Sequence, residues 1–131
     1  MIDIIAAIAL EQMKKLPANL EFRRHVQKRY NEELNPIVER PYHTETVQYY
    51  CAKVPPAHRD SLINYLADKN IHTSVHFKPL HKYAPLVQNR DYPIADVEWL
   101  KLISLPVHNG MLEEDIDYVI YWVNKYFEEV S

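Results

Sequence analysis

Three histidines lie close together in the middle of the chain. The run His72-Thr-Ser-Val-His76-Phe-Lys78-Pro-Leu-His81 is the densest group among its seven histidines. Residues 71–77 alternate apolar and polar side chains, which predicts a strand with His72 and His76 on one face. His81, in the loop that follows, could fold back toward them. Three imidazoles with an open fourth position would form a catalytic zinc site.

Two other interpretations of this run are open. The spacing of the histidines matches no known zinc-ligand pattern, and no carboxylate lies within the run. In the second interpretation the histidines and Lys78, at a strand end, bind an anion such as phosphate or carboxylate. In the third they are exposed or hydrogen-bonded polar residues without a role in chemistry.

The glycine and cysteine content excludes several kinds of catalytic site. Gly110 is the only glycine, where average usage would give about nine. P-loops, dinucleotide fingerprints and nucleophile elbows each need two or three glycines, so these sites are excluded as usually written. The single cysteine, Cys51, fits a reducing compartment, and we expect it to be a small core residue in a strand. The residues by themselves therefore give no complete catalytic site.

Length and charge are those of one ordinary globular domain. The 131 residues are 47% hydrophobic and 25% charged, and the formal net charge is −3. The chain can bury a core but lacks the basic surplus that nucleic-acid binding needs. Its apolar first ten residues are too short to span a bilayer and carry Asp3 where a signal peptide carries a base. We expect a cytoplasmic protein that binds neither nucleic acid nor membrane.

The polarity pattern predicts an α+β fold in a single domain, residues 1–131, in which two leading helices (1–34) precede a small α+β layer (45–131). The expected helices are 2–16, 18–34 with Pro17 in its first turn, 57–69, 94–102 with Val97 and Leu100 facing inward, and 112–128. The expected strands are 46–54, 71–77 and 103–105. Antiparallel pairing is favoured in this three-stranded sheet, with helices on one face, because its other face lacks a helix layer.

The first of these helices is apolar on all sides. Ile2 and Ile5 share one side with other apolar residues, and Ile4 and Ile8 share the opposite side. Such a helix is normally buried all round, yet both sides cannot face the same small core. A large exposed apolar patch usually marks an interaction surface. We therefore expect the chain to self-associate through helix 2–16, exchange it between copies or detach it from the fold.

Four segments, in chain order, resemble the DegT/DnrJ/EryC1/StrS family of pyridoxal-phosphate-dependent sugar aminotransferases. Residues 1–16 are similar to its "RM-x-x-x-x-AAI-x-L-x-Q-L-x-K-L" helix, Arg23-Arg24 with Tyr30-Asn31 to "RR…RYN", residues 71–81 to "GI-x-T-x-VHF-x-PLH", and residues 103–108 with 114–120 to "SLP-x-x-x…ED-x-D-YVI". The chain departs from the family pattern at Ala9 and Asn70, where glycine is usual.

The resemblance implies the small C-terminal domain of a fold-type I enzyme dependent on pyridoxal phosphate (PLP), begun at an internal methionine. In the family the Schiff-base lysine and the groups that hold PLP lie in a large N-terminal domain. The resemblance thus implies no catalytic residue, no bound PLP and no activity in this chain alone. It also implies that His76 and His81 face the substrate, with Lys78 near the diphosphate. The substrate would be a nucleotide-linked keto-sugar, aminated from glutamate.

Three functions remain open. The chain is the small domain of a sugar aminotransferase, as a truncated product or paired with an N-terminal half chain. Alternatively it is a non-catalytic binding or regulatory module derived from that family. In the third alternative it is a small metal protein built on the histidine run.

Overall fold

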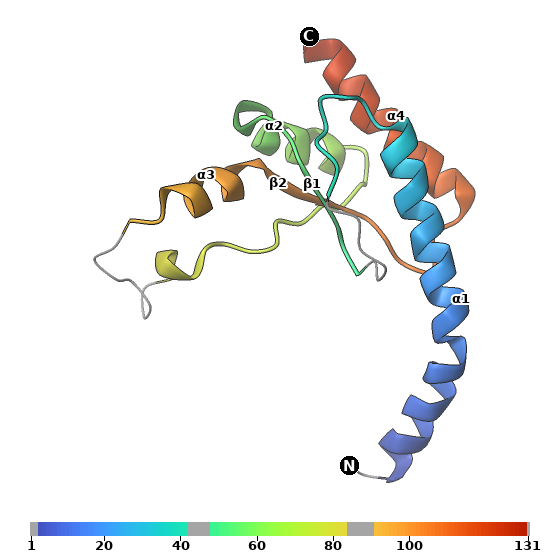
Figure 1. Ribbon diagram of the computed structural model, residues 1–131. Helices are drawn as coiled ribbons and strands as arrows, with labels where there is room; N and C mark the ends of the chain where they lie inside the picture. The colour runs from blue at the N-terminus through green and yellow to red at the C-terminus, as the bar shows by residue number, and fades with distance from the viewer. Residues whose placement is uncertain (1–2, 42–47, 84–90, 131) are drawn as a thin grey trace.

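This computed structural model describes residues 3–41, 48–83 and 91–130 of the chain. These residues contain one long helix, a two-stranded sheet and three further α-helices (Figure 1). In order, the elements are α1 (Asp3–Glu33), β1 (Tyr50–Lys53), α2 (Pro56–Ala67), the 3₁₀ turn η1 (Leu80–Lys82), α3 (Pro93–Lys101), β2 (Leu102–Leu105) and α4 (Glu113–Val130). The α+β class is therefore confirmed. No helix within these residues is long and apolar enough to cross a membrane.

The two strands pair antiparallel, as the sequence predicts. Tyr50 lies opposite Leu105 and Cys51 opposite Ser104. The prediction of a third strand at 71–77 is wrong. This segment pairs with β2 at one bridge only, where Ser74 and Ser104 exchange two backbone hydrogen bonds of 3.1 and 2.7 Å. Side-chain alternation reports which face of a segment is buried, but a strand also needs a neighbour along its length.

The predicted break at Pro17 is also wrong. α1 is one helix of 31 residues with Pro17 inside it. Proline removes one helical hydrogen bond and can kink a helix without ending it. The segments on either side, 10–16 and 18–24, contain mostly strong helix formers such as leucine, lysine, glutamate and arginine. We attribute the continuity of α1 to these flanking residues.

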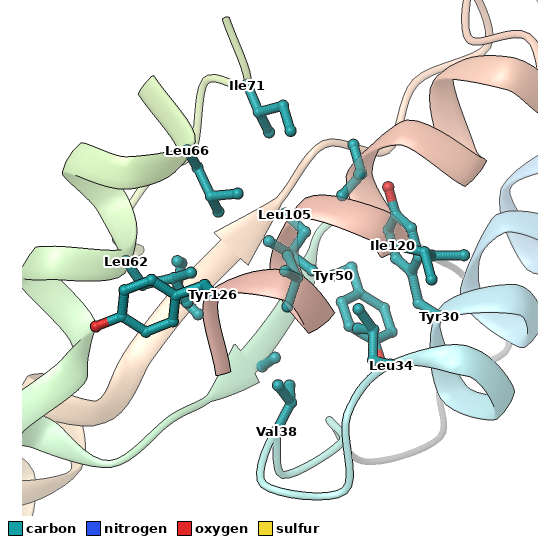
Figure 2. Close-up of a cluster of buried hydrophobic side chains, with 14 of the residues drawn as sticks. Tyr30, Leu34, Val38, Tyr50, Leu62, Leu66, Ile71, Leu105, Ile120 and Tyr126 are labelled. Atoms are coloured by element: carbon teal, nitrogen blue, oxygen red, sulfur yellow. The ribbon is translucent and has the colours of Figure 1, made fainter. Parts of the chain in front are cut away.

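The core lies between the sheet, α2, α4 and the second half of α1 (Figure 2). Tyr30 of α1 and Tyr50 of β1 are fully buried, with their rings edge to face and 5.0 Å between centroids. The Tyr30 hydroxyl donates to the Pro106 carbonyl at 3.0 Å, and the Tyr50 hydroxyl donates to Asn31 Oδ1 at 2.8 Å. Burial raises the pKa of Tyr50 to about 12 and raises that of Tyr30 as well.

The first half of α1 projects away from this core (Figure 1). Ile4 is 71% exposed, Ile5 54% and Ile8 58%, so neither side of the helix is covered. The sequence indicates that the two sides cannot both face the core, and within the described residues 3–16 neither side does. α3 also differs from its prediction, since Val97 and Leu100, which were expected to face inward, are exposed.

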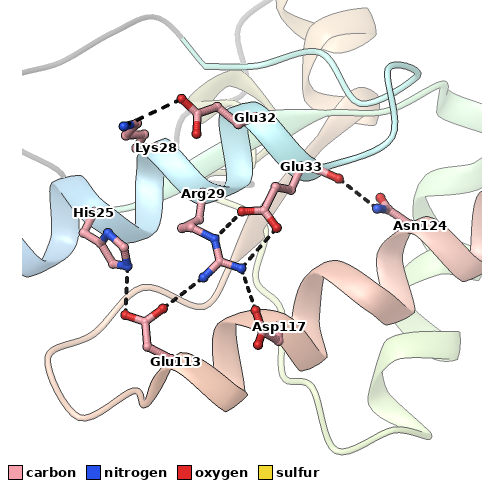
Figure 3. Close-up of polar contacts among 8 residues, drawn as sticks. All are labelled: His25, Lys28, Arg29, Glu32, Glu33, Glu113, Asp117 and Asn124. Atoms are coloured by element: carbon pink, nitrogen blue, oxygen red, sulfur yellow. Dashed lines mark hydrogen bonds and ion pairs between the residues drawn. The ribbon is translucent and has the colours of Figure 1, made fainter.

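Arg29 ties α1 to α4 through two carboxylates of α4 and also binds one carboxylate of its own helix (Figure 3). Its guanidinium donates to Glu33 on its own helix, and to Glu113 (2.9 Å) and Asp117 (2.5 Å) on α4. His25 lies 2.8 Å from the second oxygen of Glu113. The hydrogen bonds from Arg29 lower the pKa of Glu33 and raise that of Arg29.

We predict that Arg29→Gln lowers the free energy of unfolding by about 1–2 kcal/mol at pH 7, because partly exposed ion pairs contribute up to about 1 kcal/mol each. Lys28→Gln is the matched control, since Lys28 is exposed and 4.0 Å from Glu32, its ion-pair partner. Glu33 has a folded-state pKa below its ordinary value, so its contribution is present above about pH 4.5 and is lost as the pH falls through the folded pKa. In denaturant titrations, the difference in free energy of unfolding between the variant and the unmutated chain should therefore be smaller at pH 3 than at pH 7.

Candidate functional site

His76 is held in place by three neighbours. Its Nδ1 lies 3.0 Å from the hydroxyl oxygen of Ser104, which is buried in β2. Its ring lies on that of Tyr49, with 4.3 Å between centroids and 31° between planes, and the Phe77 ring meets it edge to face at 4.8 Å. A ring with these contacts has a fixed orientation, which is what a binding histidine needs.

His76 faces a surface depression of about 410 Å³ between α1 and the sheet. The lining residues are Arg23, Gln48, Tyr49, His72, Ser74, His76, Ser104, Leu105, Pro106 and Val107. Arg23 Nε donates to Asn109 Oδ1 at 3.1 Å and its NH1 donates to the Gln48 carbonyl at 3.3 Å. Among the described residues, the lining combines one arginine and two histidines with no carboxylate, a composition that suits an anion.

His81 lies in a different environment. Its Nε2 is 2.9 Å from Asp96 Oδ1, and Lys82 Nζ is also 2.9 Å from that oxygen. Its ring lies 4.8 Å from that of Tyr92. The Lys82 ammonium and, to a smaller extent, His81 lower the pKa of Asp96. His81 thus joins η1 to α3 and does not line the depression that His76 faces.

Lys78 is exposed, with its Nζ 5.6 Å from the centre of the Tyr83 ring. The structure therefore places the three predicted substrate residues in three settings and brings only His76 together with His72. Sequence reasoning missed Arg23 and Ser104 as site residues. Both lie within segments that match the family pattern, which is the signal that could have marked them, but nothing in their spacing shows that they meet.

The zinc interpretation is not supported. Among residues 3–41, 48–83 and 91–130, no three His, Cys, Asp or Glu side chains are arranged so that they could hold a metal ion. His72 and His76 line the depression, whereas His81 is paired with Asp96. His81, the third ligand that the sequence suggested, is therefore paired with Asp96 and does not join His72 and His76.

The chain is thus a long helix packed on a small antiparallel α+β layer, with a depression lined by Arg23, His72 and His76 between them. The sequence profile of the DegT/DnrJ/EryC1/StrS aminotransferase family matches residues 1–124, so the chain belongs to this family. The resemblance seen in the sequence is thus confirmed.

Two curated relatives show the extent of the match. The uncharacterized protein MJ1066 of Methanocaldococcus jannaschii is 30% identical, and GDP-perosamine synthase of Escherichia coli O157:H7 is 27% identical. Each alignment covers 98% of this chain and 37% of the relative. The chain thus spans little more than a third of the length of these relatives.

Solved structures show the same fold. Spr1654 from Streptococcus pneumoniae in its PLP form superposes with a TM-score of 0.89 at 28% identity, over 100% of this chain and 37% of that one. The aminotransferase TlmJ from Streptoalloteichus hindustanus gives a TM-score of 0.90 at 22% identity, over 98% of this chain and 37% of that one, which shows the fold alone.

Lys53 does not suit a covalent bond to PLP. A lysine that forms a Schiff base needs a lowered pKa, so that its amine is neutral. The pKa of Lys53 is instead raised by its ion pairs with Glu98 and Glu39. No lysine lines the depression around His76 within the part of the chain that the structure describes. These residues therefore do not fit PLP by themselves, and no chemical step of this chain is derived through it.

We predict that the chain alone keeps no PLP and transfers no amino group. After mixing with PLP, dialysis should remove all absorbance of a PLP–lysine adduct, and glutamate should not be consumed. A full-length PLP-binding relative such as Spr1654 provides the positive control. One equivalent of adduct on a single lysine, with turnover of glutamate, would contradict the prediction.

Proposed function

We propose that this chain is the C-terminal part of a PLP-dependent aminotransferase that acts on nucleotide-linked keto-sugars, in the cytoplasm, with glutamate as amino donor. The observation that carries the proposal is the family match over residues 1–124, together with the superposition on Spr1654 in both its PLP and its PMP form. The names of relatives point to the substrate class: one is a dTDP-3-amino-3,6-dideoxy-alpha-D-galactopyranose transaminase and another a GDP-perosamine synthase.

In this proposal the chain supplies the substrate side of the site and the rest of the enzyme supplies the lysine that binds PLP. His76 meets the substrate across the depression, because its ring is fixed by Ser104 and Tyr49. His81 faces the substrate while it remains paired with Asp96. Lys78, on the exposed surface, binds the diphosphate of the substrate. The remaining part of the enzyme is either an N-terminal half chain or the rest of one longer chain.

A chimera tests this function. The chain would replace the equivalent third of Spr1654, and transfer from glutamate to dTDP- and GDP-linked keto-sugars would be measured. We expect turnover, with a KM for the nucleotide sugar that rises about ten- to a hundredfold in His76→Ala, because one hydrogen bond to a charged group is worth about 1.5–3 kcal/mol. A folded chimera that binds PLP but transfers nothing would favour the alternative, a non-catalytic binding or regulatory module.

The projecting half of α1 supplies a second proposal, that this surface binds a protein partner. Four large apolar residues on it, Ile4, Ile8, Leu10 and Met13, are each more than half exposed. Burying each side chain would gain about 1.5–3 kcal/mol. In a solution of this chain alone, the matching apolar surface is the same helix of a second copy, so the occupant is a second copy.

We predict that Ile4→Lys combined with Ile8→Lys converts an oligomer into a monomer in sedimentation velocity, with an unchanged circular dichroism spectrum. Glu11→Lys combined with Lys14→Glu is the control, because it exchanges two charges on the same projecting half and keeps its apolar side chains. A monomeric unmutated chain at high concentration would contradict self-association through α1.

A further inference from the structure

We propose that the aromatic rings of Tyr65 on α2 and Trp122 on α4 form a binding site for a quaternary ammonium ion, and that the Lys69 ammonium occupies this site in the free chain. The site goes beyond the proposed function and does not depend on it. None of these three residues lines the depression that His76 faces.

Lys69 shows where a cation is stabilised. Its Nζ lies 4.5 Å from the centre of the Trp122 ring and 5.6 Å from the centre of the Tyr65 ring. The two ring centres are 6.0 Å apart and the ring planes meet at 65°, so the rings form an open angle around the ammonium. A cation within about 6 Å of a ring centre is attracted by the electrons of the ring face, most strongly for tryptophan. The position of Lys69 Nζ therefore marks a cation site that two rings share.

Neighbouring aromatic side chains hold both rings in place. Tyr65 packs edge to face against Tyr126, which is 5% exposed, with 5.3 Å between ring centres. Trp122 packs in the same way against Tyr118 at 6.1 Å and Tyr121 at 5.0 Å. Tyr65 and Trp122 also pack against the hydrophobic core. A site whose walls are already fixed loses little conformational entropy when a ligand binds.

A carboxylate lies beside the Tyr65 ring. Burial and, to a smaller extent, the nearby Glu129 carboxylate raise the pKa of Tyr65. Glu129 is also 4.0 Å from Lys125, one turn away on α4, and ion pairs between partly exposed side chains are weak. Glu129 therefore supplies negative charge next to the rings, which favours a ligand with a positive charge.

The backbone of Lys69 is fixed independently of its side chain. Its N–H donates to the Leu66 carbonyl at 3.0 Å, and its carbonyl accepts a hydrogen bond of 3.3 Å from the Tyr118 hydroxyl. Asn70 has a φ of 58°, in the left-handed region that asparagine tolerates, and the Ile71 N–H also donates to the Leu66 carbonyl, at 2.9 Å. These contacts end α2 without the Lys69 ammonium. Removal of the side chain should therefore open the site and leave the fold unchanged.

A ligand can displace the Lys69 side chain from the rings. The residue is partly exposed, and a lysine ammonium on its flexible stem is strongly hydrated, so water competes with the rings for it. A quaternary ammonium has no N–H group for water to bind, and aromatic rings are the groups that recognise it. Both distances from Nζ exceed the approach of about 3.5–4 Å between unbonded carbon atoms, which leaves space for methyl groups around the nitrogen. A quaternary ammonium therefore suits the site in both hydration and size.

The test is a titration of the full chain with choline chloride, followed by the ¹H–¹⁵N signals of the indole rings of its two tryptophans. Choline should shift the Trp122 signal in a saturable way, and Trp99, on α3, reports any non-specific effect. Sodium chloride at the same concentration controls for ionic strength. Dimethylbutanol, in which carbon replaces the nitrogen of choline, controls for binding that depends on apolar contact alone.

Three variants make the test specific. Lys69→Ala should bind choline about two- to thirtyfold more tightly, because it removes a competing cation–π contact. Lys69→Arg should not gain this affinity, since its guanidinium keeps a cation over the rings. Lys82→Ala is the matched control: Lys82 Nζ lies 5.8 Å from the centre of the Trp99 ring, so this variant has the same net charge as Lys69→Ala and an unaltered Trp122 site.

Absence of a saturable Trp122 shift in both the unmutated chain and a folded Lys69→Ala variant would overturn the site. Equal shifts with dimethylbutanol, or equal shifts of the Trp99 signal, would also overturn it. An unchanged affinity in folded Lys69→Ala, or the same gain in Lys82→Ala, would overturn the role of Lys69 as occupant. These measurements use neither PLP nor a nucleotide sugar, so their failure is separate from a failure of the chimera experiment.

Discussion

The contact between Tyr30 and Tyr50 is the interaction on which the rest of the structure depends. Two strands of four residues cannot form a core by themselves. Tyr30 joins the end of α1 to β1 by ring packing and to the segment after β2 through the Pro106 carbonyl. Pro106 and the strand residues before it form one wall of the anion-compatible depression. The same buried side chain therefore stabilises the fold and sets the separation between α1 and that wall.

The sequence predicts those elements whose burial is periodic along the chain. α4 buries Ile116, Val119, Ile120 and Val123 as its pattern indicates, and α2 buries Leu62 and Leu66. The pattern is misleading where apolar residues are not covered. Val97 and Leu100 have the spacing of a core-facing helix, but they remain exposed in the described structure. Apolar periodicity shows which surface needs cover, and it does not show what covers it.

The candidate site was less accessible to sequence reasoning, because its contacts join distant segments. Arg23 and His76 are more than fifty residues apart and line the same depression only because α1 packs beside the sheet. His81 follows His76 closely in sequence, yet its partner Asp96 lies on α3 and draws it into another environment. Local spacing identified His76 and His72 as a pair, whereas Ser104 could be recognised only once the bridge to Ser74 was known.

α1 is continuous from its projecting half to its buried end. Asp3 and Arg23 belong to the same unbroken helix, about 30 Å apart at 1.5 Å per residue, and the fulcrum is the buried end at Val26 and Tyr30. A tilt about that end displaces the projecting half much farther than it displaces Arg23. The exposed surface of the projecting half and the guanidinium at the rim of the depression therefore belong to one and the same element.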